Sequence, residues 1–80
     1  MSTIRSNAKV ERAILDEISK YDVGPNEVVP LGALQAKLLQ AGFLIEEIYD
    51  AMQSLQDRGF IAPGPSPAMI KITEAGFAQF

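Results

Sequence analysis

The spacing of the apolar residues changes once along this chain of 80 residues, and that change constrains the fold more than any other feature. Up to about residue 58, apolar side chains recur every three or four positions, which is the period of an amphipathic helix. Over residues 69–72, Ile70 and Ile72 alternate with Met69 and Lys71, as in a strand with one buried face. Helices followed by short strands predict an α+β domain. We expect one domain over residues 1–80, with 1–5 as a flexible N-terminus, because a second core has no room.

Three amphipathic helices are predicted in the first part of the chain. Their apolar stripes are, in order, Val10, Ile14 and Ile18; Leu31, Leu34 and Leu38; and Ile45, Ile48, Met52 and Leu55. We expect the first helix to span about residues 7–21. Pro30 suits the first turn of the second helix, which has no use for an N–H at that point. Gly42 and Gly59 end the second and third helices, since glycine readily adopts the left-handed conformation that follows a helix.

A small sheet is predicted from three further segments. Residues 60–61 and 69–72 have the composition of short strands. Residues 28–29 are too few to form a strand alone, but they can add hydrogen bonds to that sheet. Residues 62–68 contain three prolines and a glycine, so we predict a loop there, because proline cannot donate to a ladder of hydrogen bonds.

The last residues are predicted to form a short helical turn. Thr73 can cap a turn over residues 74–80. We place Phe77 and Phe80 in the core, because they are three positions apart and share one face of that turn. Before the third helix, residues 43 and 44 are both large and apolar, and we expect one of the two to be exposed.

The composition excludes several kinds of chemistry. The sequence has no Cys and no His, which excludes a disulfide framework, a Cys/His zinc site, a thiol nucleophile and acid–base catalysis by histidine. The remaining candidates for catalysis or cation binding are two carboxylate clusters: Glu46, Glu47 and Asp50, and Asp16 and Glu17. No matching ligands for a cation are recognisable elsewhere in the chain. We therefore expect a non-enzymatic binding module, with no metal and no cofactor.

No segment has the pattern of a signal peptide, and no apolar run approaches the ~20 residues of a membrane helix. We therefore expect a cytoplasmic protein without a membrane partner. Seven Lys and Arg residues against ten Asp and Glu residues give a net charge of −3. This balance argues against indiscriminate binding to nucleic acid, because contacts with phosphates need basic side chains.

The order of the predicted elements and three short motifs resemble the winged helix-turn-helix family of small bacterial transcription regulators. Six residues separate Gly42 from Ile48, the interval between the turn glycine and the first buried aliphatic residue in this family. Residues 55–61 are similar to its Leu-x-x-x-Gly-Leu-Ile run, and residues 72–76 to its Leu-Thr-x-x-Gly run. The resemblance covers nearly the whole chain. It implies a winged helix, which is a three-helix bundle with a C-terminal two- to three-stranded antiparallel β-wing. Leu38 stands where the family usually has alanine, and we expect it to push the two helices apart.

The resemblance also implies that the third helix is a recognition helix and that the chain is a DNA-binding transcription regulator. The positions that would face DNA are Glu46, Glu47, Tyr49, Asp50 and Gln53. Three of these five are carboxylates, and one Arg against four acids gives residues 42–60 a net charge of −3, which disfavours contact with phosphates. DNA binding remains the first interpretation. The alternative is a protein-interaction module (an adaptor, an inhibitor or a nucleic-acid mimic) that uses the acidic third helix and the Pro-rich wing.

Basic residues offer further contacts under either interpretation. The candidates for contact with a phosphate backbone or a partner are Arg5, Lys9, Arg12, Lys37 and Lys71. The first three share one face of the first helix. That face is either solvated, or a contact for phosphates, for an acidic partner or for the third helix of a second copy, which would give a homodimer. The wing tip lacks basic residues and is either a compact loop or a contact for a protein groove; it comprises Pro63, Gly64, Pro65, Ser66 and Pro67.

Overall fold

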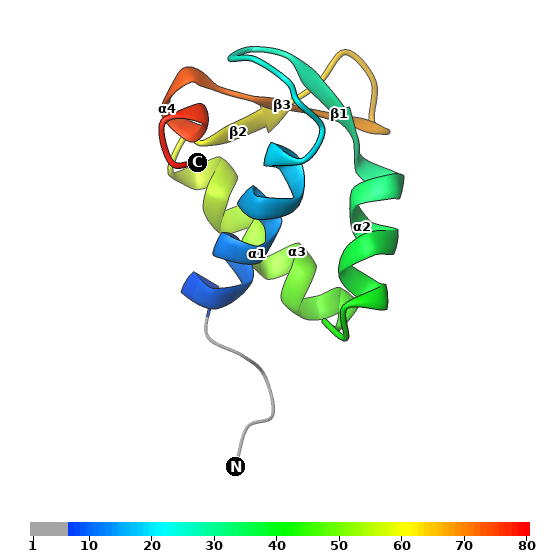
Figure 1. Ribbon diagram of the computed structural model, residues 1–80. Coiled ribbons are helices and arrows are strands. Elements are labelled where there is room, and N and C mark those ends of the chain that lie inside the picture. The colour runs from blue at the N-terminus through cyan, green and yellow to red at the C-terminus, as the bar shows by residue number, and fades with distance from the viewer. Residues whose placement is uncertain (1–6) are drawn as a thin grey trace.

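The computed structural model describes residues 7–80, which form four helices and three strands in the predicted α+β class. The elements are, in chain order, α1 (Asn7–Ser19), β1 (Val28–Pro30), α2 (Leu31–Gln40), α3 (Ile45–Asp57), β2 (Ile61–Pro63), β3 (Met69–Ile72) and α4 (Glu74–Phe77). Figure 1 shows α1, α2 and α3 on one side of the sheet, with α4 close to β2. The predictions for residues 1–5, including the role of Arg5, lie outside the described residues.

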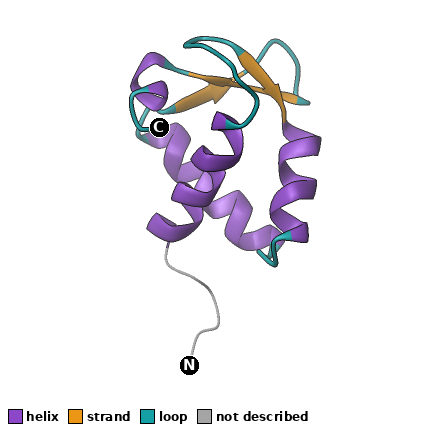
Figure 2. Cartoon of the chain, viewed as in Figure 1, coloured by secondary structure: helices purple, strands orange, loops and turns teal. Residues whose placement is uncertain are grey.

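The three strands form one antiparallel sheet in the order β1-β3-β2. The central strand is β3, in which Ile70 pairs with Val29 and Ile72 pairs with Ile61. Both isoleucines of β3 are buried, whereas Met69 and Lys71 are only partly covered, so the predicted alternation is confirmed. Figure 2 shows this sheet lying across one end of the helices. The predicted addition of residues 28–29 to the sheet is also confirmed.

The predicted loop over residues 62–68 is too long, because β2 continues to Pro63. Pro63 lies opposite Ile70, and the next hydrogen bond along the ladder runs from the Gly64 N–H to the carbonyl oxygen of Met69 (3.1 Å). Antiparallel pairs alternate between bonded and non-bonded positions, so Pro63 occupies a position where the ladder needs no N–H. It also lies in an edge strand, where proline is tolerated.

The core lies between the three long helices and the inner face of the sheet. The predicted residues that are buried there are Val10, Ile14, Ile18, Leu34, Leu38, Ile48, Leu55, Ile70 and Ile72. The predicted stripe of the third helix is wrong at Ile45, which is exposed, and Ala51 is buried in addition. Ile45 is the first residue of α3, so it lies at the edge of the core rather than within it.

The prediction that Phe77 and Phe80 belong to the core is wrong. Their exposed fractions are 39% and 43%, and the two rings pack against each other with 5.4 Å between their centroids. Helix α4 also ends at Phe77, earlier than predicted. The buried residue of α4 is Gly76, whose backbone lies so close to Phe60 that a Cβ would collide with the Phe60 carbonyl oxygen. The last helical turn therefore contacts Phe60 through its backbone at Gly76, and the rings of Phe77 and Phe80 lie outside the core.

Candidate interaction surface

A sharp turn joins α2 to α3. Gly42 has a φ of 98°, in the left-handed region predicted for it. The Gly42 N–H donates to the carbonyl oxygen of Leu39 (3.0 Å), and the Phe43 N–H donates to that of Leu38 (3.1 Å), which closes the end of α2. Phe43 packs against the core while Leu44 is exposed, so the expectation that one of the two is exposed is confirmed.

Exposed apolar side chains gather around this turn. Residues 7–80 contain six exposed large apolar residues, and four of them fall within residues 39–49, around this turn. We call these four the apolar patch: Leu39, Leu44, Ile45 and Tyr49. Ile45 and Tyr49 are four residues apart on α3 and therefore neighbour each other on its surface. Tyr49 is the most exposed of the four, at 58%. Leu39 and Leu44 flank the turn on its two sides.

Carboxylates adjoin the apolar patch on α3. Glu46 and Asp50 are exposed and four residues apart, one position after Ile45 and Tyr49 respectively. We call this pair the acidic rim. Helix α3 contains no Lys or Arg, so nothing within the helix neutralises the rim. Further along, Gln53 is exposed and donates a hydrogen bond to Asp57 (3.0 Å). Four of the five residues predicted to face a ligand are therefore exposed.

The fifth residue, Glu47, was predicted on the exposed face but is buried, with 2% of its surface exposed. Its Oε1 accepts a hydrogen bond from the Leu44 N–H (2.8 Å), one of the N–H groups that the start of a helix leaves without an intrahelical partner. This is one half of a capping box, since the side chain of Leu44 cannot accept a bond in return. Glu47 therefore belongs to the fold and not to the contact surface.

Removing this cap is expected to destabilise the protein. We predict that Glu47→Ala lowers the free energy of unfolding by about 1 kcal/mol or more, because the Leu44 N–H loses its acceptor. Glu47→Gln should cost less, since the amide oxygen can still accept. Urea denaturation measures both, with Glu46→Ala as the exposed control, expected to change stability by less than ~0.5 kcal/mol. Equal losses for Glu46→Ala and Glu47→Ala would contradict this assignment.

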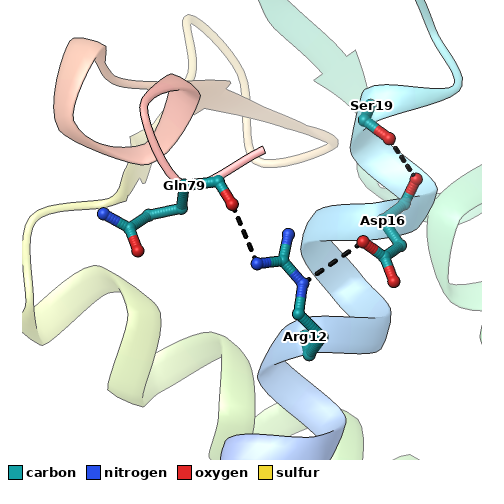
Figure 3. Close-up of polar contacts among 4 residues, drawn as sticks. All are labelled: Arg12, Asp16, Ser19 and Gln79. Carbon is teal, nitrogen blue, oxygen red and sulfur yellow. Dashed lines mark hydrogen bonds and ion pairs between the residues drawn. The ribbon is translucent and has the colours of Figure 1, made fainter.

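The predicted basic residues that the structure describes lie on three different elements. Arg12 is used within the chain: its Nε donates to Asp16 (3.2 Å) and its Nη1 to the carbonyl oxygen of Gln79 (2.8 Å), as Figure 3 shows. Lys9 on α1 and Lys37 on α2 are exposed, and Lys71 on β3 is partly covered. The predicted stripe of basic residues on α1 therefore has one member bound to the C-terminal segment.

The wing tip is a compact turn. Gly64 is partly buried against Met69, with 2.9 Å between the Cβ that a side chain at Gly64 would carry and the Met69 Cβ. The Met69 N–H donates to the carbonyl oxygen of Ser66 (3.1 Å). Pro65, Ser66 and Pro67 are exposed. The tip is a compact loop, and its contact with a protein groove stays a prediction.

The sequence patterns did not predict the apolar patch, but the spacing along the third helix did indicate that Glu47 is buried. Glu47 is four residues before Ala51 and eight before Leu55, so it lies on the buried face of α3. Leu39 lies outside the predicted stripe of Leu31, Leu34 and Leu38, and its exposure agrees with that stripe.

Comparisons of the chain with protein-family models, with characterised proteins and with solved structures find no match. In the part of the chain that the structure describes, no helix has the length and apolar character needed to cross a membrane. Within residues 7–80, no three Asp or Glu side chains come together where they could hold a metal ion.

Proposed function

We propose that this chain is a non-enzymatic, winged-helix-like module that docks a protein partner on the apolar patch and its acidic rim. The observation that carries the proposal is the concentration of exposed apolar side chains at the α2–α3 turn. Exposed apolar residues are common singly, but a group of them bordered by charges is typical of a protein interface. Tyr49 suits such a role, because tyrosine supplies a large contact area at a small cost in conformational entropy.

The charge of the rim defines the chemistry of the partner. Glu46 and Asp50 favour Lys or Arg at the edge of the partner's contact surface, through complementary potential. The apolar patch favours Leu, Ile or aromatic side chains at its centre. An amphipathic segment with an apolar face and basic edges satisfies both requirements.

DNA binding by a transcription regulator is the second candidate, and the order of the elements favours it. The helix–strand–helix–helix–strand–strand order and the β1-β3-β2 sheet are compatible with a winged helix, a fold that often reads DNA through its third long helix. Against this candidate, α3 contains no Lys or Arg, and carboxylates at its start would face phosphates. We therefore rank DNA below a protein partner.

An amphipathic peptide of leucine and lysine tests the first candidate. We expect the peptide to bind the wild type and the double variant Ile45→Ser with Tyr49→Ser to bind about 30-fold more weakly, since two contact residues of a hot spot are removed. Fluorescence anisotropy of the labelled peptide gives both affinities. The matched control is Phe77→Ser with Phe80→Ser, which removes the exposed apolar pair of the C-terminal turn. Equal weakening by both double variants would mean unspecific adhesion and would sink the proposal.

Random duplex DNA tests the second candidate. We expect no binding of the wild type at ~20 mM salt, and measurable binding by the variant Glu46→Lys with Asp50→Lys, which converts the rim from repelling to attracting phosphates. Micromolar affinity of the wild type, falling steeply as salt is added, would instead favour the DNA-binding regulator. Electrophoretic mobility and anisotropy both report this difference.

A further inference from the structure

The outer face of the sheet, which points away from α1, α2 and α3, carries apolar side chains around one lysine (Figure 1). The two isoleucines of β3 are buried, so Met69 and Lys71, which alternate with them, lie on the outer face. Side chains that lie directly opposite each other in an antiparallel pair share one face. Val28 and Ala62 lie opposite Lys71, and Pro30 lies opposite Met69. We call these five residues the outer sheet face.

The outer sheet face has a positive charge without a partner. Pro30 is exposed, and the other four residues of this face are partly exposed. Three other basic side chains form ion pairs at 3.0–3.2 Å: Arg12 with Asp16, Lys20 with Glu17, and Arg58 with Glu11. Within residues 7–80, Lys71 forms no ion pair. A lone cation among apolar neighbours is complementary to a surface that presents a carboxylate beside apolar side chains.

The apolar patch and the acidic rim on α3 have this chemistry, at a matching spacing. One row across the strands contains Pro30 and Met69, and the next row, two positions along, contains Val28, Lys71 and Ala62. At about 3.3 Å per residue, the two rows lie roughly 7 Å apart. On a helix about 10 Å across, adjacent residues lie 100° apart around the axis, which separates them by roughly 8 Å at the surface. The apolar row and the charged row of the sheet therefore fit the apolar residues and the carboxylates of α3.

We propose that the outer sheet face binds the apolar patch and the acidic rim of a second copy of this chain. Ile45 and Tyr49 lie on the apolar row, and the carboxylates of Glu46 and Asp50 lie against Lys71. The contact joins two different surfaces, so each pair of copies keeps one free surface of each kind, and further copies can add head to tail. This inference rests on the proposed function, because it names a second copy as the protein that the apolar patch docks.

Dilution of the wild type from ~1 mM to ~10 µM tests the proposal, because self-association follows mass action. Sedimentation should show an average mass that rises above that of one chain as the concentration increases. Amide shifts of isotope-labelled protein should change on both surfaces, at Ile45 and Tyr49 and at Ala62 and Lys71. Changes confined to α3, or located elsewhere, would overturn the proposal.

The leucine–lysine peptide separates this inference from the proposed function. A wild type that stays monomeric at every concentration but binds the peptide would contradict the second copy and leave the proposed function standing. A monomer that does not bind the peptide would contradict both.

Charge reversal connects the association to the named residues. Lys71→Glu alone, and Glu46→Lys with Asp50→Lys alone, each place like charges across the contact and should weaken association about tenfold. An equal mixture of the two variants again brings opposite charges together at every contact, so association should return. The control Lys9→Glu makes the same change in net charge as Lys71→Glu, but on α1, and should leave association unchanged. A mixture that stays monomeric, although both variants give the dispersed amide spectra of folded protein, would show that the proposal is wrong.

Discussion

Replacing Gly76 by alanine is expected to lower the free energy of unfolding by about 3 kcal/mol. The Cβ of an alanine would collide with the Phe60 carbonyl oxygen and would lie 2.7 Å from the Ile72 Cδ1. The first obstacle is backbone, which cannot rotate away as a side chain can. The hydroxyl of Thr73 holds the two segments together, because it accepts from the Gly76 N–H (3.0 Å) and donates to the Gly59 carbonyl oxygen (2.6 Å). The collision therefore has to displace α4 from residues 59–60, which join α3 to β2, and from Ile72 of β3.

The matched control is Gly32→Ala in α2. A Cβ at Gly32 would meet nothing within 4 Å, so alanine should stabilise the protein by up to ~1 kcal/mol through its higher helix propensity. Urea denaturation measures both variants, and an unchanged m-value would show that the unfolded state is comparable. A loss of less than ~0.5 kcal/mol for Gly76→Ala would contradict the close packing of α4.

Replacing Leu38 by alanine is expected to cost about 2–5 kcal/mol, because the side chain is fully buried and its removal leaves a cavity. Position 38 also tests an expectation drawn from the sequence. The proposed resemblance to the winged helix-turn-helix family predicts alanine there, and a leucine in its place was expected to push the helices apart. In the structure, Leu38 belongs to the same core cluster as Leu34 and Ile48, so we attribute to it a stabilising role.

The sign of the change in stability separates these two views of Leu38. A leucine that forces the helices apart would be relieved by the alanine, and Leu38→Ala would then be neutral or stabilising. The control is the adjacent Leu39→Ala, which removes the same atoms from an exposed position and should cost less than ~1 kcal/mol. Thermal unfolding of the two variants gives the comparison directly.

The spacing of the apolar residues predicted the helices and the central strand, because the residues that recur at this spacing form the core. Residues such as Ile14, Ile48 and Ile72 recur at intervals that place them on one face of their element, and each is fully buried. The left-handed turn at Gly42 was equally predictable, since few residues other than glycine adopt a φ of 98°. Such features are local, and they need no knowledge of which elements pack together.

The features that the sequence did not predict depend on tertiary packing. Pro63 is allowed in β2 only because of its register against Ile70, which lies across a turn. Phe77 is exposed because Gly76 makes the close contact instead. Glu11 and Arg58 are 47 positions apart, and no spacing rule joins residues at that distance. The apolar patch belongs to this group too, because the residues that stay uncovered become known only when the core is closed.

Two of the acids counted in the net charge, Glu11 and Glu47, are buried, so the net charge does not describe the charge of the surface. Of the acids counted on the third helix, Glu47 supports the start of the helix and is removed from the surface. The one arginine counted near that helix, Arg58, pairs with Glu11 at the other end of α3. The exposed start of α3 therefore presents Glu46 and Asp50 with no basic residue in the same helix, so it remains acidic.

The most direct test of the central claim maps two ligands on one isotope-labelled sample. The leucine–lysine peptide and random duplex DNA are titrated in turn at ~20 mM salt, where electrostatic attraction to phosphates is strongest. We predict saturable shifts at Leu44, Ile45 and Tyr49 with the peptide, and none at these residues with DNA. Saturable shifts at the same residues with DNA, together with none from the peptide, would contradict the assignment of α3 to a protein partner.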